Sequence, residues 1–236
     1  MSSEPTPVKP APEQSIDAGM YLGLGCLVIS SVVLVISGLI FFSGYRMLQY
    51  NADPATRLRV AKNILATEAL PEGLHPAMAM AMPDALQMVV LTDDPAVMEG
   101  PDPSFNEMGL AMFRILSNPR TTEGEFVSDF LTGKQEPDTN DDMMPAMYDG
   151  QSIGKGTITA PQAIAQFDTH RGTLQVFGWQ GKGVVTRFVV ECNAGGPPVF
   201  GLWFMREPIY SPTPKVGNSE TLSAMLQPMK LCVLPE

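Results

Sequence analysis

One uncharged segment constrains this chain more than any other feature. No Asp, Glu, Lys or Arg occurs in the 28 residues from Ala18 to Tyr45, and most of these residues are apolar or small. A helix rises about 1.5 Å per residue, so about 20 residues cross the hydrocarbon core of a bilayer. The sequence therefore predicts a single-pass membrane protein with a transmembrane helix over residues 18–45, in direct contact with the lipid bilayer.

A cleavable signal peptide fits the same segment less well. Such a peptide has a basic start, an apolar core of about 7–15 residues and a small-residue cleavage site. Here the residues before the apolar run are not basic, and the run itself is longer than that core. We therefore expect an uncleaved anchor.

The anchor separates parts of different composition. The residues before it are rich in Pro, Ser and Glu and contain too little apolar surface to fold. The residues after the linker are numerous enough to build one hydrophobic core. The predicted organisation is a disordered tail, a transmembrane helix, a juxtamembrane linker and one soluble domain, over residues 1–17, 18–45, 46–52 and 53–236.

The soluble part is strongly acidic. Residues 51–236 contain 13 of the 15 Lys and Arg and 22 of the 25 Asp and Glu, which is a formal charge of −9. Such a charge repels both the nucleic-acid backbone and anionic lipid headgroups. The composition excludes nucleic acid as a partner and favours another membrane or envelope protein.

Two opposing signals bear on the side of the membrane that the domain occupies. Cys192 and Cys232 can form one disulfide, which would require an oxidising compartment, although a pair of free buried cysteines is the alternative. The positive-inside rule instead favours a cytoplasmic domain, because basic residues follow the span at Arg46, Arg57, Arg59 and Lys62. We prefer the extracytoplasmic side and leave the alternative open.

Hydrophobic periodicity predicts an α+β domain with a mainly antiparallel sheet flanked by helices. Asp53-Pro54 is typical of a helix start, an N-cap followed by proline. Further helices are expected from a capping box at Thr122 and Glu125 to Gly133, and from Ser219. Strands are expected around Met78–Met82 and over Leu86–Thr92, Gly109–Leu116, Ile153–Thr159, Gly172–Trp179, Val184–Cys192 and Val199–Arg206.

The connections are predicted from glycine, proline and acidic residues. Pro83-Asp84 should turn between the first two strands, and Gln180–Gly183 between two of the last three. A loop rich in acid and methionine is expected over Glu136–Gly150.

This order of elements resembles the α-β-α sandwich of the PsbP-like proteins. The resemblance covers about Asp53 to Leu234 and rests on element order and on the segments Ala69–His75 and Ser219–Leu231. That family consists largely of non-enzymatic assembly and binding proteins. The resemblance therefore implies a binding or scaffolding module.

The sequence contains no recognisable catalytic motif. His75 and His170 are its two histidines, and both are expected in surface turns without a neighbouring nucleophile motif. A Walker lysine, an HExxH motif and a CxxC pair are all missing from the sequence. We predict no catalytic residue and no cofactor; a hydrolase with an unrecognised site is the second alternative.

One acidic segment begins like a calcium loop. Asp138, Asn140 and Asp142 have the spacing of the first ligands, and Asp149 stands at the twelfth position. The sixth position is Met143 where the turn requires glycine, so a solvated acidic loop is the preferred interpretation.

Methionine is unusually abundant, with 16 residues in the chain. Met78, Met80 and Met82 alternate with alanine, which puts three thioethers on one face of a strand with His75 nearby. Thioethers suit Cu(I), whereas flexible methionines also fill cores or form adaptable contact surfaces. The leading hypothesis is a membrane-anchored, non-enzymatic binding or assembly module that uses this strand and the Glu136–Gly150 loop. The alternative is an envelope copper-binding protein.

Overall fold

The computed structural model describes residues 53–232, except 83, 101, 118, 135–144, 208–218, 228 and 230. All of them belong to the compact unit Met47–Glu236. In this described part, none of the helices is long and apolar enough to cross a bilayer. The predicted tail 1–17, transmembrane helix 18–45 and linker 46–52 lie outside the described residues.

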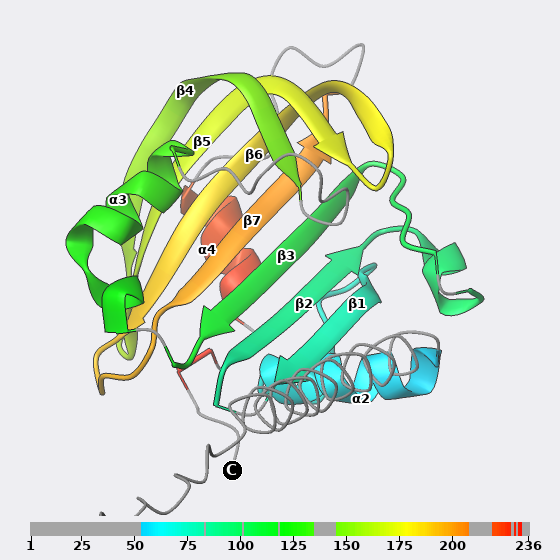
Figure 1. Cartoon of the computed structure of the whole chain (residues 1–236), viewed down its shortest axis with the longest axis horizontal. Helices are drawn as coiled ribbons and strands as arrows, with labels where there is room; N and C mark the ends of the chain where they lie inside the picture. Colours follow the sequence, from blue (N-terminus) through cyan, green and yellow to red (C-terminus); the bar gives the residue numbers. More distant parts are fainter. Residues whose placement is uncertain are drawn as a thin grey trace, which may run out of the picture. The chain divides into compact units, whose positions relative to one another are not determined.

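Seven antiparallel strands form one sheet in the order β1-β2-β3-β7-β6-β5-β4 (Figure 1). The strands are β1 His75–Met82, β2 Leu86–Thr92, β3 Met108–Ile115, β4 Ala146–Thr159, β5 Ala163–Val176, β6 Trp179–Cys192 and β7 Val199–Arg206. The helices are α2 Pro54–Ile64, α3 Gly124–Thr132 and α4 Ser219–Leu226, with the short 3₁₀ helices η1 Pro95–Met98 and η2 Pro119–Thr122. The predicted α+β class with a mainly antiparallel sheet is confirmed.

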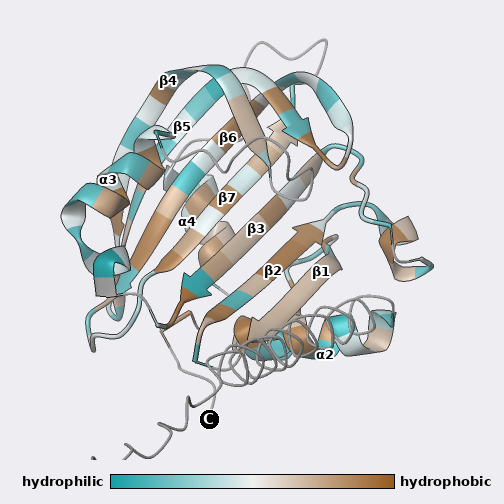
Figure 2. Cartoon of the chain, viewed as in Figure 1, coloured by the Kyte–Doolittle hydropathy of each residue, from teal (hydrophilic) through white to brown (hydrophobic). Residues whose placement is uncertain are grey.

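Alternate residues of the strands fill two cores, one on each face of the sheet. One face, here called the α2/α4 face, packs Val89, Leu110 and Val184 against α2 and α4. The other, the α3 face, packs Val90, Val185 and Phe200 against α3. Figure 1 shows α3 and α4 on opposite sides of the sheet, and Figure 2 shows hydrophobic residues concentrated on its central strands. Strands β6 and β7 are buried on both faces, which explains their nearly continuous apolar runs.

The predicted start of α2 is confirmed. The Asp53 carboxylate accepts hydrogen bonds from the backbone N–H groups of Ala55 and Thr56, at 3.3 and 3.1 Å. A hydrogen bond from the Thr56 hydroxyl is the main cause that lowers the pKa of Asp53. The cap therefore fixes where α2 begins.

The predicted start of α3 is wrong by two residues. The helix begins at Gly124, and its N-cap is Glu123, which makes no side-chain capping bond. Thr122 instead ends η2. The predicted end is confirmed, because Gly133 closes α3 in the left-handed conformation with φ 76°.

One hairpin was also predicted wrongly. Strand β5 begins at Ala163 rather than Gly172, and it turns into β6 at Phe177-Gly178, with φ of 49° and 72°. Positive φ at both central residues is typical of a two-residue type I′ turn. The residues Gln180–Gly183, predicted as the turn, lie in β6, where Gly181 leaves room for the Trp179 ring.

The Glu136–Gly150 loop was predicted too long. Residues 146–150 are already part of β4, while 136–144 lie outside the described residues. The loop prediction failed there because polar Asp149 and Gly150 look like turn residues, yet they sit at a register shift between β4 and β5.

Candidate functional site: a methionine-lined sheet face

Met78, Met80 and Met82 lie on one face of β1, as their spacing predicts. They pair with Val90, Met88 and Leu86 of β2. Residues that pair directly in an antiparallel sheet share a face, and both Val90 and Met78 belong to the core of the α3 face. The three methionines therefore belong to the α3 face.

Ala79, between Met78 and Met80, packs in the core of the opposite face, whereas Ala81, near the end of the strand, is exposed. Ala77 and Ala79 are each 2% exposed, and α2 packs on β1. Small side chains allow this close approach of helix and strand. Met78 and Met80 remain half-buried and Met82 is 36% exposed, so the methionine side of β1 is the open one.

Met88 adds a fourth thioether that the sequence interpretation did not include. It is half-buried, lies in β2 and is paired directly with Met80. The pairing register of the β1–β2 hairpin brings Met88 to this face. The turn at Asp84, with φ 55°, sets which residues of the two strands face each other. We call Met78, Met80, Met82 and Met88 the methionine face.

His75 was predicted to lie in a surface turn, but it is the first residue of β1. The turn before it is closed by a bond from the Leu74 N–H to the Pro71 carbonyl, at 3.1 Å. A register shift between Pro76 and Met78 pairs His75 with Thr92 and Met78 with Val90. Because Thr92 and Val90 are alternate residues of β2, the shift puts His75 on the same face as Met78.

Two further residues of the sequence hypotheses, Met147 and Asp149, are not brought to this face. Met147 is 3% exposed in the core under α3, and Asp149 is exposed in β4 with φ 53°. The remaining residues lie outside the described part of the chain: Asp138, Asn140, Asp142, Met143 and Met144. Within the described part, no group of three His, Cys, Asp or Glu side chains has the geometry of a metal site.

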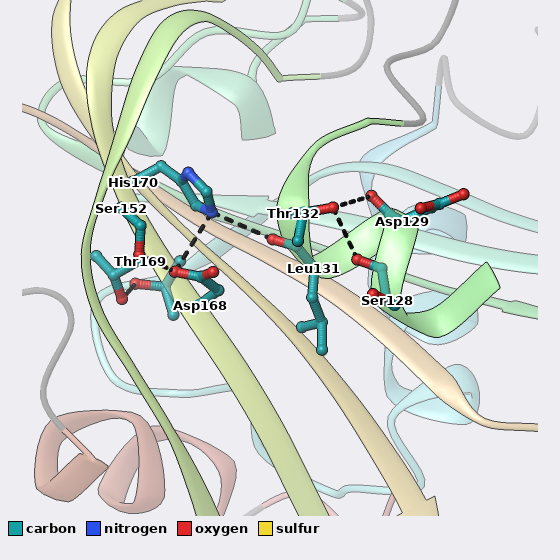
Figure 3. A network of polar contacts seen from close by, with 9 residues as sticks. Ser128, Asp129, Leu131, Thr132, Ser152, Asp168, Thr169 and His170 are labelled. Atoms are coloured by element: carbon teal, nitrogen blue, oxygen red, sulfur yellow. Dashed lines mark hydrogen bonds and ion pairs between the residues drawn. The ribbon is translucent and has the colours of Figure 1, made fainter. Parts of the chain in front are cut away.

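His170 also departs from the prediction, since it lies in β5 and is only 6% exposed. Its Nε2 lies 3.2 Å from the Leu131 carbonyl oxygen at the end of α3, to which it donates, and 3.4 Å from Asp168 Oδ1 (Figure 3). The Ser152 hydroxyl donates to the same carboxylate oxygen at 2.6 Å. This network joins α3 to β5 and β4.

The order of the groups in this network does not suit nucleophilic catalysis. In a hydrolase triad the serine donates to the histidine, which acts as the base. Here Ser152 donates to Asp168, and His170 Nε2 is a donor. Gly133 closes α3 directly over the Arg187 guanidinium, where a Cβ would come within 2.7 Å of Nη1. The contacts of His170 and Arg187 with the end of α3 account for the position of this helix on the sheet.

Two grooves lie elsewhere on the domain. One of about 550 Å³ lies between α4 and the ends of β4 and β5, with a mainly apolar lining that includes Ile158, Ala165 and Leu226. The other, of about 450 Å³, lies between α3 and β4, and Asp168 lines it together with Lys155 and Glu191. The methionine face belongs to neither.

Cys192 and Cys232 are joined in a disulfide, with an S–S distance of 2.14 Å. This is the pair whose state the sequence left open. The bond connects the end of β6 to the segment after α4, where Arg114 donates from Nη2 to the Leu231 carbonyl. Burial lowers the pKa of Arg114, which is 4% exposed.

Sequence reasoning also missed a second buried arginine. Arg57 is fully buried and donates to the carbonyls of Ala77, Val97 and Gly100. These bonds join α2, β1 and η1. The helical periodicity gave no signal for it, because arginine in an amphipathic helix is normally assigned to the solvent side.

No protein-family model, curated protein or solved structure matches the chain. The resemblance to the PsbP-like proteins therefore stays a prediction.

Proposed function

We propose that this chain is a single-pass, membrane-anchored, non-enzymatic binding or assembly module whose methionine face binds another membrane protein. The methionine face carries this proposal, because it presents four apolar side chains that are only partly buried. Unbranched thioether side chains adapt to different surfaces, which favours methionine where a protein must fit a partner.

The predicted anchor supports a partner in the same membrane. The linker 46–52 spans at most about 25 Å when fully extended, so the anchor keeps the domain close to the bilayer. Confinement to a membrane raises the effective concentration of the domain toward other membrane components. The partner we propose presents an apolar patch surrounded by basic residues, which would complement the acidic domain.

The disulfide supports an extracytoplasmic position of the domain, since disulfides persist in oxidising compartments. Labelling with a membrane-impermeant maleimide tests this on intact and lysed cells carrying Cys26→Ser. We expect labelling of Cys192 and Cys232 only after reduction and denaturation. Free thiols that react without reductant, and only after lysis, would contradict the extracytoplasmic position.

Photocrosslinking in the intact membrane tests the contact surface. We would replace Met80 by a photoreactive amino acid in the full chain, and Gln180, which is exposed in the β5–β6 hairpin, as the matched control. The expected result is a crosslink from position 80 to one integral membrane protein, identified by mass spectrometry, and none from position 180.

A second variant shows whether that crosslink depends on the apolar face. Met82→Asp places a charge on the most exposed methionine of the face and should abolish the crosslink from position 80. A thermal unfolding curve close to that of the parent chain shows that the domain still folds. Equal crosslinking from positions 80 and 180, or a crosslink unaffected by Met82→Asp, would refute the proposal.

A further inference from the structure

We infer that Met78, Met80 and Met88 form a thioether site for one Cu(I) ion. This goes beyond the proposed function, which requires only that the face is apolar and adaptable. The site joins two strands, and the hairpin register creates it by pairing Met80 with Met88.

The backbone places the three side chains at neighbouring positions. Directly paired residues of antiparallel strands have Cα atoms about 4.5–5.5 Å apart. Met78 and Met80 are alternate residues of one strand, about 6.6 Å apart along it. All three residues share the α3 face and are half-buried, so the site is neither sealed in the core nor freely solvated.

The donor chemistry selects the ion. Soft thioether sulfur favours Cu(I), whereas Mg²⁺ and Ca²⁺ require oxygen ligands. Structural zinc requires cysteine, histidine or carboxylate ligands, and the described part holds no such group of three. Thioethers carry no proton to lose, and the acidic domain attracts a monovalent cation.

Packing alone does not require methionine at these positions. Strands favour β-branched and aromatic residues, and β2 has Val89 and Val90 directly after Met88. Met80 of β1 and Met88 of β2 instead place flexible thioether side chains where this face opens, one on each strand of the hairpin. His75 lies on the same face and would serve as an additional, nitrogen ligand.

Cu(I) titration of the full-length protein tests the site. The protein is purified in detergent without oxygen, carries Cys26→Ser to remove a competing thiol, and is titrated with Cu(I) in competition with a chromogenic Cu(I) chelator. We expect one equivalent to bind. The triple variant Met78→Leu, Met80→Leu, Met88→Leu should lose more than about 100-fold in affinity, because all three sulfur donors are removed.

The controls separate a lost ligand from a damaged fold. Leucine conserves the volume of methionine, so the triple variant should unfold at nearly the same temperature as the parent. Met147→Leu, at a buried methionine outside the site, should leave Cu(I) affinity unchanged. His75→Ala should weaken binding less than the triple variant does.

The outcomes also separate this inference from the proposed function. Cu(I) binding that is equal in the parent and the triple variant, or absent in the parent, overturns the copper site. The same leucine variant keeps the face apolar. A photoreactive amino acid at Leu86, outside the three substituted positions, should therefore still crosslink to the partner. Loss of that crosslink would overturn the apolar contact surface, whatever the Cu(I) affinity of the variant.

Discussion

The α3 face of the sheet is built differently at its two sides. Over β6 and β7 it carries Val185, Phe200 and Leu202, all no more than 6% exposed and packed with α3 in one core. Over β1 and β2 it carries the methionine face, which is half-buried to exposed. The same backbone architecture thus supports a closed core on one side and an open, adaptable surface on the other.

The difference follows from which face of each strand is packed. Strands β6 and β7 are apolar at consecutive positions because both their faces are covered. Strand β1 alternates small and large residues from Ala77 to Met82, and Ala79 packs in one core with α2. A strand that is covered on one side only leaves its larger side chains available for another molecule.

The largest expected effect comes from the closed side. Phe200 is fully buried, with its ring 5.3 Å from that of Phe113 and 5.1 Å from that of Phe130. Phe200→Ala should lower the free energy of unfolding by about 3–5 kcal/mol, because it leaves a cavity. Met80→Ala should cost about 1 kcal/mol at a half-buried site. Urea unfolding of both variants measures this, and equal losses would break the comparison.

Loss of the disulfide should have the next largest effect on stability. The bond closes a loop with a sequence separation of 40 and holds the segment after α4 on the α2/α4 face. Replacing both Cys192 and Cys232 by serine should lower the free energy of unfolding by about 2–4 kcal/mol. Thermal unfolding with and without reductant measures it; a parent protein insensitive to reductant under denaturing conditions would contradict the disulfide.

The two faces of β1 should respond differently to leucine. Ala79→Leu overfills the contact with α2 and should cost about 1–3 kcal/mol. Met80→Leu, on the open face, conserves volume and should cost less than about 1 kcal/mol. Chemical unfolding of the two variants measures the difference. Equal costs would show that both faces of β1 are packed alike.

The smallest expected effect concerns acid stability near β1. The Ser104 hydroxyl, which donates at 2.7 Å, is the main cause that lowers the pKa of Asp94, the N-cap of η1. A lowered pKa stabilises the fold above the unfolded-state value, about 3.9, and this contribution is lost as pH falls toward the folded-state value. Asp94→Asn should therefore reduce the fall of the melting temperature between pH 6 and pH 3. Parallel curves for parent and variant would exclude this contribution.

The elements that the sequence predicted well are those with a strong local signal. Asp53-Pro54 starts α2, Gly133 ends α3, and the runs that became β2 and β7 are mostly apolar. The failures occur where residues with turn propensity lie inside strands. Gly181 and Gly183 in β6 and Gly172 in β5 are examples: Gly181 makes room for the Trp179 ring of its own strand, and the other two lie against side-chain and backbone atoms of neighbouring strands.

The candidate site was predictable in part. The alternation of Met78, Met80 and Met82 identified one strand and one face, because side chains alternate with period two wherever a strand forms. Met88 and the same-face position of His75 were not predictable. Both depend on the register of β1 against β2, including the shift after Pro76, which no single strand encodes.

By itself, the sequence determined the uncharged segment, the acid charge of the domain and the period of its strands, because these depend on residue identity and spacing alone. Only the tertiary structure decided which side of β1 is open, that His170 is buried against α3, and that Cys192 meets Cys232. Each of these depends on residues far apart in the chain, and their proximity arises only when the strands pair and the helices pack on the sheet.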